Sequence, residues 1–187
     1  MFKNKYVWSI FLGGCMLFSP WAEHAHAQRV AIKTNALYWA GATPNLGVEF
    51  RLSRHFTLGM EGAFNRFKIS KIDTRMIGCM PELRYWFSGR PHAGHQVGVM
   101  GLVGDYRLNV KDSGHEGSAY GFGPTYAYSW VLSRRWSMEA NVGVGLLRVN
   151  EKVYTATNME TYPSEPNNKK WLLAPLRVGL TFVYLIK

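Results

Sequence analysis

Apolar and polar residues alternate along most of the chain that follows residue 27, and this period of two is typical of β-strands with different surroundings on their two faces. The segment 136–149 shows it most clearly. One face carries Trp136, Met138, Ala140, Val142, Val144 and Leu146, and the other carries Ser137, Glu139, Asn141, Gly143 and Gly145. The predicted strands are 30–38, 45–52, 56–67, 75–87, 96–108, 120–132, 136–149 and 172–184.

These segments predict an all-β fold: an eight-stranded antiparallel up-and-down β-barrel that is transmembrane. Several are about 12 residues long, which is enough for a tilted strand to span a bilayer. The segment 96–108 alternates poorly, so its two faces stay unassigned. Pro81, Pro124 and Pro175 lie inside predicted strands, where a closed barrel has no free edge for a residue without an N–H. Bulges or earlier strand ends are expected to accommodate them.

The bulky face of the strands is predicted to point outward, and the small, polar face to line the interior. Outer-membrane barrels have this arrangement, whereas a soluble ligand-binding barrel points its bulk inward. The charged residues on the polar face are Lys33, Glu49, Arg51, Glu61, Glu82, Arg84, Glu139 and Arg177. Acids and bases in equal number predict a paired, structural network in the lumen, because eight strands leave no aqueous pore.

The connections between predicted strands alternate between short and long. The second and sixth, 53–55 and 133–135, are tight, and the fourth, 88–95, is moderate. The seventh, 150–170, is the longest, and whether it is ordered stays open; the first, 39–44, is short and departs from the trend. Such alternation is typical of outer-membrane barrels with both termini in the periplasm.

Aromatic residues are predicted to form a girdle at each membrane interface, where amphipathic rings are enriched. Those expected near the periplasmic rim are Phe56, Tyr85, Phe87, Trp130, Trp136 and Tyr184. Those expected near the outer rim are Tyr38, Trp39, Tyr106, Tyr120 and Trp171.

The first 27 residues predict a cleaved signal peptide, which leaves residues 28–187 as a single outer-membrane β-barrel domain. Lys3 and Lys5 precede an apolar run, and the Ala-His-Ala sequence at 25–27 is a small-x-small cleavage site. A retained membrane anchor and a lipid attached to Cys15 are the alternatives. Export predicts the outer membrane of a Gram-negative bacterium as the location.

Charge changes the expected partners. Removing the predicted signal peptide takes two of the 22 basic residues and one of the 12 acidic ones, so the exported chain stays strongly basic. An exported protein meets little nucleic acid, so outer-membrane lipid, anionic lipopolysaccharide and a surface or fimbrial protein are the expected partners. The exported part keeps a single cysteine, Cys79, and therefore forms no internal disulfide.

Several motifs carry a resemblance: KTN at 33–35, TPNLGVE at 43–49, PELRYWF at 81–87, LSRRW at 132–136 and the ending YLIK at 184–187. Together they resemble the family catalogued as domain of unknown function 3575, found in the Bacteroides group, over essentially the whole exported chain. The resemblance implies an outer-membrane barrel-like protein that is sometimes encoded near fimbrial genes. The family has no established activity, so the resemblance implies no functional residues.

Candidate catalytic residues are few. Asp112, Ser113 and His115 in the predicted outward connection bring together an acid, a hydroxyl and an imidazole, the ingredients of nucleophilic or acid–base catalysis. A solvated turn is the favoured interpretation. His92 and His95 have the spacing of a helical turn, but no third ligand accompanies them, so no metal and no cofactor is predicted.

Three functions are consistent with this pattern. The favoured one is a non-enzymatic outer-membrane β-barrel with a structural, surface-docking or adhesion role, for which the resemblance suggests a link to fimbrial assembly. The second is a lipid A-modifying barrel enzyme that uses the residues around His115. The third is a soluble periplasmic ligand-binding barrel, which requires the bulky face to point inward.

Overall fold

The computed structural model describes residues 30–69, 72–110, 113–155 and 168–186. The predicted signal peptide at 1–27 lies outside the described residues, as does 156–167 within the predicted long connection. Among the residues described, no helix is both long and apolar enough to cross a membrane.

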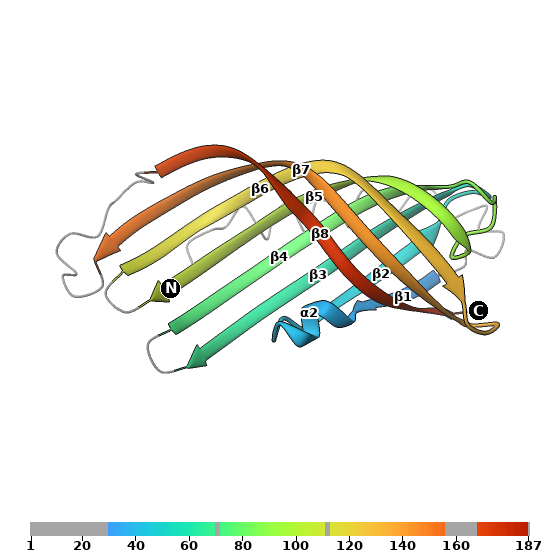
Figure 1. The fold of residues 1–187 in the computed structure, drawn as a ribbon, viewed down its shortest axis with the longest axis horizontal. Coiled ribbons are helices and arrows are strands. Elements are labelled where there is room, and N and C mark those ends of the chain that lie inside the picture. The colour runs from blue at the N-terminus through green and yellow to red at the C-terminus, as the bar shows by residue number, and fades with distance from the viewer. Residues whose placement is uncertain (1–29, 70–71, 111–112, 156–167, 187) are drawn as a thin grey trace, which may run out of the picture.

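The described chain forms one short helix and eight strands. They are β1 (Val30–Asn35), α2 (Ala36–Ala40), β2 (Asn45–Arg51), β3 (Phe56–Ile69), β4 (Ile72–Trp86), β5 (Gly94–Val110), β6 (Ser113–Val131), β7 (Trp136–Thr155) and β8 (Asn168–Ile186). Each strand pairs antiparallel with the next, and β8 pairs with β1, so the sheet closes into a barrel in sequence order (Figure 1). The prediction of an eight-stranded antiparallel β-barrel is confirmed.

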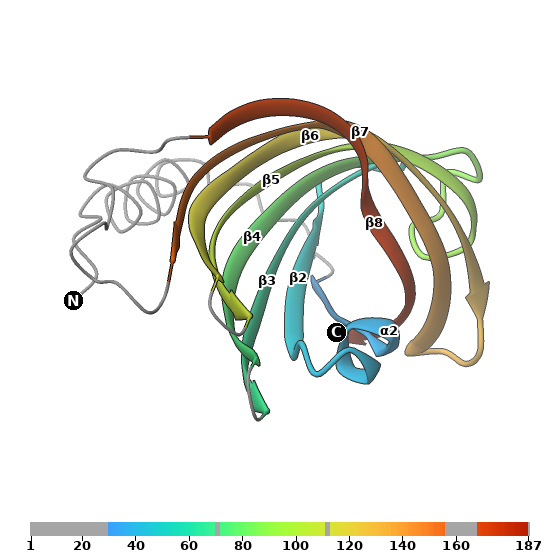
Figure 2. The ribbon, with the colours of Figure 1, turned by 60° about the vertical axis from the view of Figure 1, so that its left-hand side comes forward.

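Strand length differs strongly around the barrel. β1 and β2 have 6 and 7 residues, whereas β6, β7 and β8 have 19, 20 and 19. The wall is therefore low at β1 and β2 and tall along the later strands (Figures 1 and 2). The helix α2 directly follows β1, on the side of the barrel where the strands are short, and contacts β8.

The tall strands run further than the alternation predicts. β6 begins at Ser113 instead of residue 120, and β7 ends at Thr155 instead of residue 149. The ladder continues through this region, where His115 pairs with Val153. Polar residues occur on both faces here, so the period of two in hydrophobicity stops before the backbone pairing does. The predicted connections at 109–119 and 150–170 are accordingly too long.

The last three residues of the predicted strand 30–38 are helical, because Asn35 ends β1 and caps α2. The Asn35 side chain accepts a hydrogen bond from the Leu37 backbone N–H at 3.1 Å, which satisfies one of the unpaired donors at the start of the helix. The backbone N–H of Gly41 donates to the carbonyl of Leu37 at the other end.

Local breaks in the ladder accommodate the three prolines inside strands. Pro81 stays paired with β3 and Pro124 with β5, while the ladder on the other side of each, with β5 and with β7 respectively, skips the proline. Pro175 precedes a β-bulge, where β8 shifts its register between Gly143 and Val144 of β7. Each missing N–H therefore coincides with an interruption in pairing.

The bulge also changes which residues of β8 face inward. Leu176 and Arg177 are neighbours and both are buried, so the alternation resets between them. One unbroken alternation through the predicted strand 172–184 places Leu172 and Leu176 on the outward face with Val178. The bulge shows this assignment to be wrong. Leu176 belongs to a small apolar layer inside the barrel, formed by Ala63, Met80, Met100 and Leu176.

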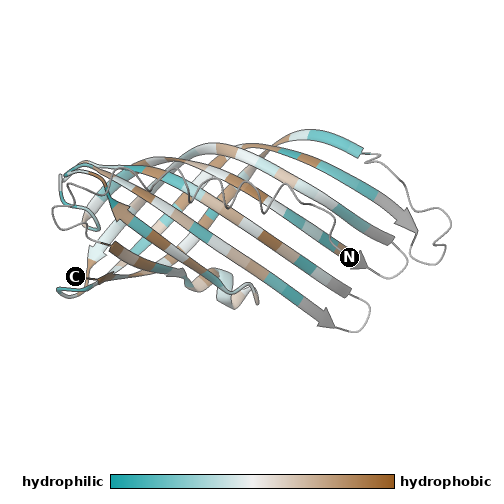
Figure 3. Cartoon of the chain, turned by 180° about the vertical axis from the view of Figure 1, so that it is seen from behind, coloured by the Kyte–Doolittle hydropathy of each residue, from teal (hydrophilic) through white to brown (hydrophobic). Residues whose placement is uncertain are grey.

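The outside of the barrel carries large apolar side chains and the inside carries polar ones. In β5, whose faces the sequence left unassigned, Val97 and Val99 point outward and Gln96 and Met100 point inward. The exposed fraction reaches 62% at Val99 and 74% at Leu173. Figure 3 shows this alternation of apolar and hydrophilic residues along the strands.

Candidate functional site

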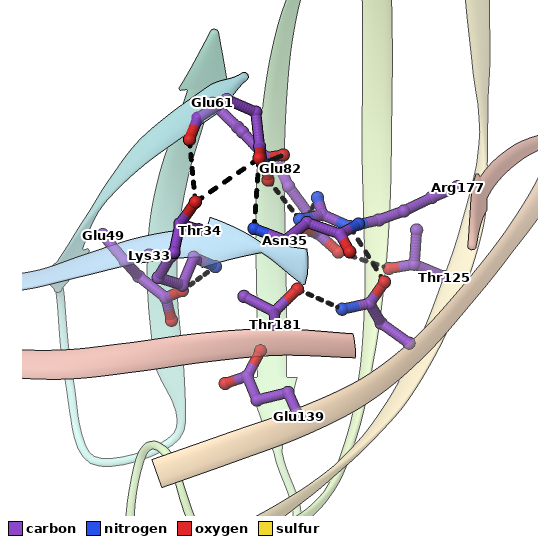
Figure 4. A network of polar contacts seen from close by, with 12 residues as sticks. Lys33, Thr34, Asn35, Glu49, Glu61, Glu82, Thr125, Glu139, Arg177 and Thr181 are labelled. Atoms are coloured by element: carbon purple, nitrogen blue, oxygen red, sulfur yellow. Dashed lines mark hydrogen bonds and ion pairs between the residues drawn. The ribbon is translucent and has the colours of Figure 1, made fainter. Parts of the chain in front are cut away.

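A network of charged side chains lies buried inside the barrel, and Figure 4 shows part of it. Its members are Lys33, Glu49, Glu61, Glu82, Arg84, Glu139 and Arg177. Each is at most 5% exposed. They come from β1, β2, β3, β4, β7 and β8, and each occupies an inward position of its strand. The alternation of the sequence is thus what brings them together.

Arg84 contacts three carboxylates at once. Its Nη2 lies 2.6 Å from Glu82 Oε2, and its Nη1 lies 3.2 Å from Glu49 Oε2 and 3.0 Å from Glu139 Oε2. Glu49 also pairs with Lys33 of the neighbouring strand. A planar guanidinium with five donors suits this position, because it can bind several carboxylates in fixed directions.

Arg177 forms the second centre of the network. Its Nη1 lies 3.1 Å from Glu82 Oε2, and its Nη2 pairs with Glu61. Glu82 therefore bridges Arg84 and Arg177 and joins the two centres. Thr125 donates a hydrogen bond to the other oxygen of Glu82 at 2.7 Å. The carboxylates of the network thus face cations and a hydroxyl, both on neighbouring strands and across the lumen.

His92 also contacts this network, from the connection between β4 and β5. The sequence did not predict His92 as a member of the network. Its Nδ1 lies 3.6 Å from Glu139 Oε1, and its ring contacts that of Trp86. The connection between β4 and β5 carries it inward, with a φ of 63° and its carbonyl bound by Ser129 Oγ at 2.9 Å. A residue outside a strand has no alternation, so only the fold places it.

Arg51 was predicted in the network and does not join it. Arg51 is the last residue of β2, and its Nε donates to the carbonyl of Ser53 at 3.0 Å. Alternation gives the face of a residue but not its height in the barrel, and Arg51 lies at the rim.

The histidine pair considered for a metal is split between the two faces. His92 points inward, whereas His95 Nδ1 lies 2.6 Å from the hydroxyl of Tyr126 on the outward face. Among the described residues, no group of three or more His, Cys, Asp and Glu side chains could hold a metal ion.

Aromatic residues gather on the outward face at the rim that carries the connections 52–55, 87–93 and 132–135. Tyr85 contacts both Phe56 and Phe87, with ring centres 5.3 and 5.4 Å apart. Trp130 contacts Tyr128 at 4.8 Å, and Trp136 contacts Tyr184 at 5.0 Å. The residues predicted for the periplasmic girdle therefore lie together around this rim.

The aromatic residues predicted for the other rim divide between the two faces. Trp39 and Trp171 are exposed, at 56% and 57%. Tyr38 instead points inward from α2 and packs against the apolar layer, because the helix turns it away from the outside. Tyr106 also points inward, and its hydroxyl donates to Glu151 Oε2 at 3.0 Å. Tyr38 and Tyr106 are thus wrongly predicted as girdle residues.

Glu151 is the centre of a second polar cluster, at the tall end of the lumen. Asn168 Nδ2 lies 2.6 Å from Glu151 Oε1, and Lys170 Nζ lies 3.5 Å from the same oxygen. His115 Nδ1 lies 3.5 Å from Oε2. Burial acts to raise the pKa of Glu151, but the hydrogen bond from Tyr106 and the charge of Lys170 outweigh it and lower that pKa.

Of the candidate catalytic residues, the structure places only His115 with partners. Its imidazole faces a carboxylate, as in acid–base chemistry, but the side chains of Asp112 and Ser113 lie outside the described part of the structure. Ser118 lies two strand positions beyond Glu116 on the outward face, away from His115, and its hydroxyl donates a hydrogen bond to Asp105 Oδ1 at 2.6 Å. No nucleophile among the described side chains is hydrogen-bonded to the imidazole.

The fold and its interior define a class of protein: a closed all-β barrel with a filled, charged lumen and an apolar outside. The family model described as "Protein of unknown function (DUF3575)" matches residues 14–186, and the chain belongs to this family. No curated protein and no solved structure matches the chain.

Proposed function

We propose that the chain is a non-enzymatic β-barrel of the outer membrane of a Gram-negative bacterium, with a structural or surface-docking role. The observation that carries the proposal is the inverted polarity of the fold. Charged side chains occupy the lumen, and large apolar side chains cover the outside of the strands.

This polarity is costly in water. Monomeric soluble proteins rarely expose contiguous apolar patches larger than a few hundred Å². Here Val99, Phe122, Val142 and Leu173 are all at least half exposed, and they lie on four neighbouring strands of the barrel. Hydrocarbon removes that cost, and β8 closes the sheet by pairing with β1 over Thr181–Ile186.

The filled lumen supports a structural role. The two arginine centres cross the interior, and Tyr38 with the apolar layer lies beside them. Eight strands enclose a space that side chains can fill, so the barrel forms a solid wall element and not a pore. Specific contacts with partners would then be made at the ends of the strands.

Fractionation and a gel test the proposal. The chain, expressed with its N-terminus in a Gram-negative host, is expected in the outer-membrane fraction, and its mobility on a gel is expected to change on boiling. A protein that is released as soluble periplasmic material, with the same mobility before and after boiling, would refute it. That result would favour a soluble barrel instead.

A second candidate, a lipid A-modifying enzyme, draws on the distance of 3.5 Å between His115 and Glu151 at the tall mouth of the barrel. The test is the mass profile of lipid A from cells that express the wild type or His115→Ala. Cells without the chain provide the reference profile. A lipid A profile that the wild type changes and His115→Ala leaves at the reference supports the enzyme. The same profile in all three kinds of cell excludes it.

A further inference from the structure

The outward face changes character near the tall ends of the strands. Described outward positions there carry six basic side chains, which we name the basic collar: Arg66, Arg75, Arg107, Arg148, Lys152 and Lys169. The acidic side chains among them are Asp105 and Glu116.

Strand pairing places four of the six collar residues on one continuous line. Arg66 pairs with Arg75, Arg75 with Arg107, Arg107 with Glu116, and Glu116 with Lys152. Directly paired residues share a face and stand about 5 Å apart, so three arginines lie side by side on β3, β4 and β5. Glu116 of the same line offsets part of this charge, because its Oε2 lies 2.7 Å from Arg107 Nη2. Four bases against one acid leave the line net positive, and a net positive surface attracts anions.

A groove lies just below this line on the outside of the later strands. It has a volume of about 390 Å³ and is lined by Tyr120, Phe122, Arg148 and Trp171, among others. The Arg148 guanidinium lies over the Trp171 ring, 5.6 Å from its centre. The positive charge of Arg148 therefore borders a groove that is lined largely by apolar and aromatic side chains.

Large apolar side chains begin directly below the collar. Phe64 is the outward neighbour of Arg66, and Ile77 is that of Arg75, and both are more than half exposed. A basic row at the upper boundary of an apolar wall lies where lipid phosphates meet acyl chains in a bilayer.

We infer that the basic collar binds the phosphate groups of lipopolysaccharide in the outer leaflet, with part of the same lipid in the groove beside Trp171. This inference rests on the proposed membrane location and adds a specific lipid contact to it. Guanidinium groups suit the task because they bind phosphate oxygens in bidentate pairs.

Basic residues also occur in the connections at the opposite rim, and they provide a matched control. Arg54, Arg90 and Arg134 are exposed there. Replacing them removes as many charges as replacing Arg66, Arg75 and Arg107 does. General attraction between a basic protein and an acidic lipid predicts equal effects, whereas the collar predicts unequal ones.

The experiment is native mass spectrometry of the purified full-length barrel in detergent with lipid A that carries both phosphates, and with the same lipid after the phosphates are removed. The triple variant R66Q/R75Q/R107Q is expected to bind the phosphorylated lipid about tenfold more weakly than the wild type, since three screened ion contacts add up. R54Q/R90Q/R134Q is expected to bind like the wild type. R66K/R75K/R107K is expected to fall between the wild type and the collar Gln variant, because Lys keeps the charge but loses the bidentate geometry.

Equal losses in the two Gln variants, no loss in the collar variant, or equal binding of the lipid without phosphates would each overturn the inference. If the triple variant does not show the heat-dependent mobility of a closed barrel, R148Q/K169Q is compared with R54Q/R134Q instead, so that each variant removes two charges. Fractionation of the wild type separates the two ideas. A wild type outside the membrane refutes the proposed function, and a wild type in the outer membrane with collar-independent binding refutes the collar alone.

Discussion

Arg84 and Glu139 are 55 positions apart in the sequence, yet Arg84 Nη1 lies 3.0 Å from Glu139 Oε2 inside the barrel. The contact joins β4 to β7, which share no ladder. The backbone hydrogen bonds of a barrel fix each strand against its neighbours only. Contacts across the lumen hold strands that are not neighbours at fixed distances from each other. In this barrel ion pairs make those contacts, whereas in a soluble barrel apolar side chains make them.

Replacing Arg84 by Met is therefore expected to destabilise the barrel strongly. The substitution leaves Glu49, Glu82 and Glu139 without a shared cation, and breaking a buried ion pair by removing one partner costs about 3–5 kcal/mol. The free energy of unfolding in urea, measured for protein folded into lipid vesicles, checks this. Arg54→Met removes an exposed arginine and is expected to change that free energy by no more than about 0.5 kcal/mol. Similar values for the two variants would mean that the lumen network does not hold the walls together.

The eight strands and most of the lumen network could be predicted from the sequence, because both follow from alternation. Glu139 and Arg177 were assigned inward by the same period of two that identified their strands. The prediction failed where a local event changes the period. Asn35 caps a helix inside a predicted strand, and the bulge after Pro175 resets the faces of β8. Neither is visible in hydrophobicity.

The parts of the site that lie outside the apolar belt could not be predicted in the same way. His92 lies in a connection, and its inward position depends on a backbone conformation with positive φ. Glu151 and His115 belong to strand extensions with polar residues on both faces, so hydrophobicity gives no period there. The pairing of Arg66 with Arg75 depends on register, which alternation leaves undetermined.

Gly123 is expected to tolerate no side chain. A Cβ atom at this position would lie 2.2 Å from the Val144 carbonyl oxygen and 2.5 Å from the Cα of Gly145, where both partners are backbone. Gly123→Ala is therefore expected to cost about 3 kcal/mol or more, or to prevent closure of the barrel. The matched change is Gly62→Ala, where the nearest atom is the Leu46 carbonyl oxygen at 4.0 Å. Heat-dependent mobility on a gel, retained by Gly62→Ala and lost or weakened in Gly123→Ala, checks this; the same behaviour in both would contradict the close approach of β6 and β7.

Glu151 is expected to contribute stability that depends on pH. It lies at the mouth, beyond the proposed membrane-spanning segments, and its partners lower its pKa from the ordinary 4.5 in the folded barrel. A carboxyl group with a lowered folded-state pKa stabilises the fold above pH 4.5, and this stabilisation is lost as the pH falls through the lowered value. The difference in unfolding free energy between the wild type and Glu151→Gln is thus expected to shrink in acid. The control is Glu116→Gln, which removes a carboxylate from a partly exposed ion pair on the outward face. A difference that grows as the pH falls would show the opposite sign and refute the assignment.

The effect of Val99→Lys on stability distinguishes a barrel embedded in lipid from a barrel in water. The Val99 side chain is 62% exposed in the middle of the outward apolar run of β5, so replacing it by Lys in a water-soluble protein would change stability little. In a bilayer, the same Lys faces hydrocarbon, and near the midplane it costs about 2–4 kcal/mol. Ser118→Lys, at the level of the basic collar, is expected to cost no more than about 1 kcal/mol, because a charge near the interface is cheap. Urea unfolding of the three proteins in lipid vesicles measures both effects. If Val99→Lys is as stable as the wild type, this face of β5 is in contact with water. That outcome would refute the proposed membrane location.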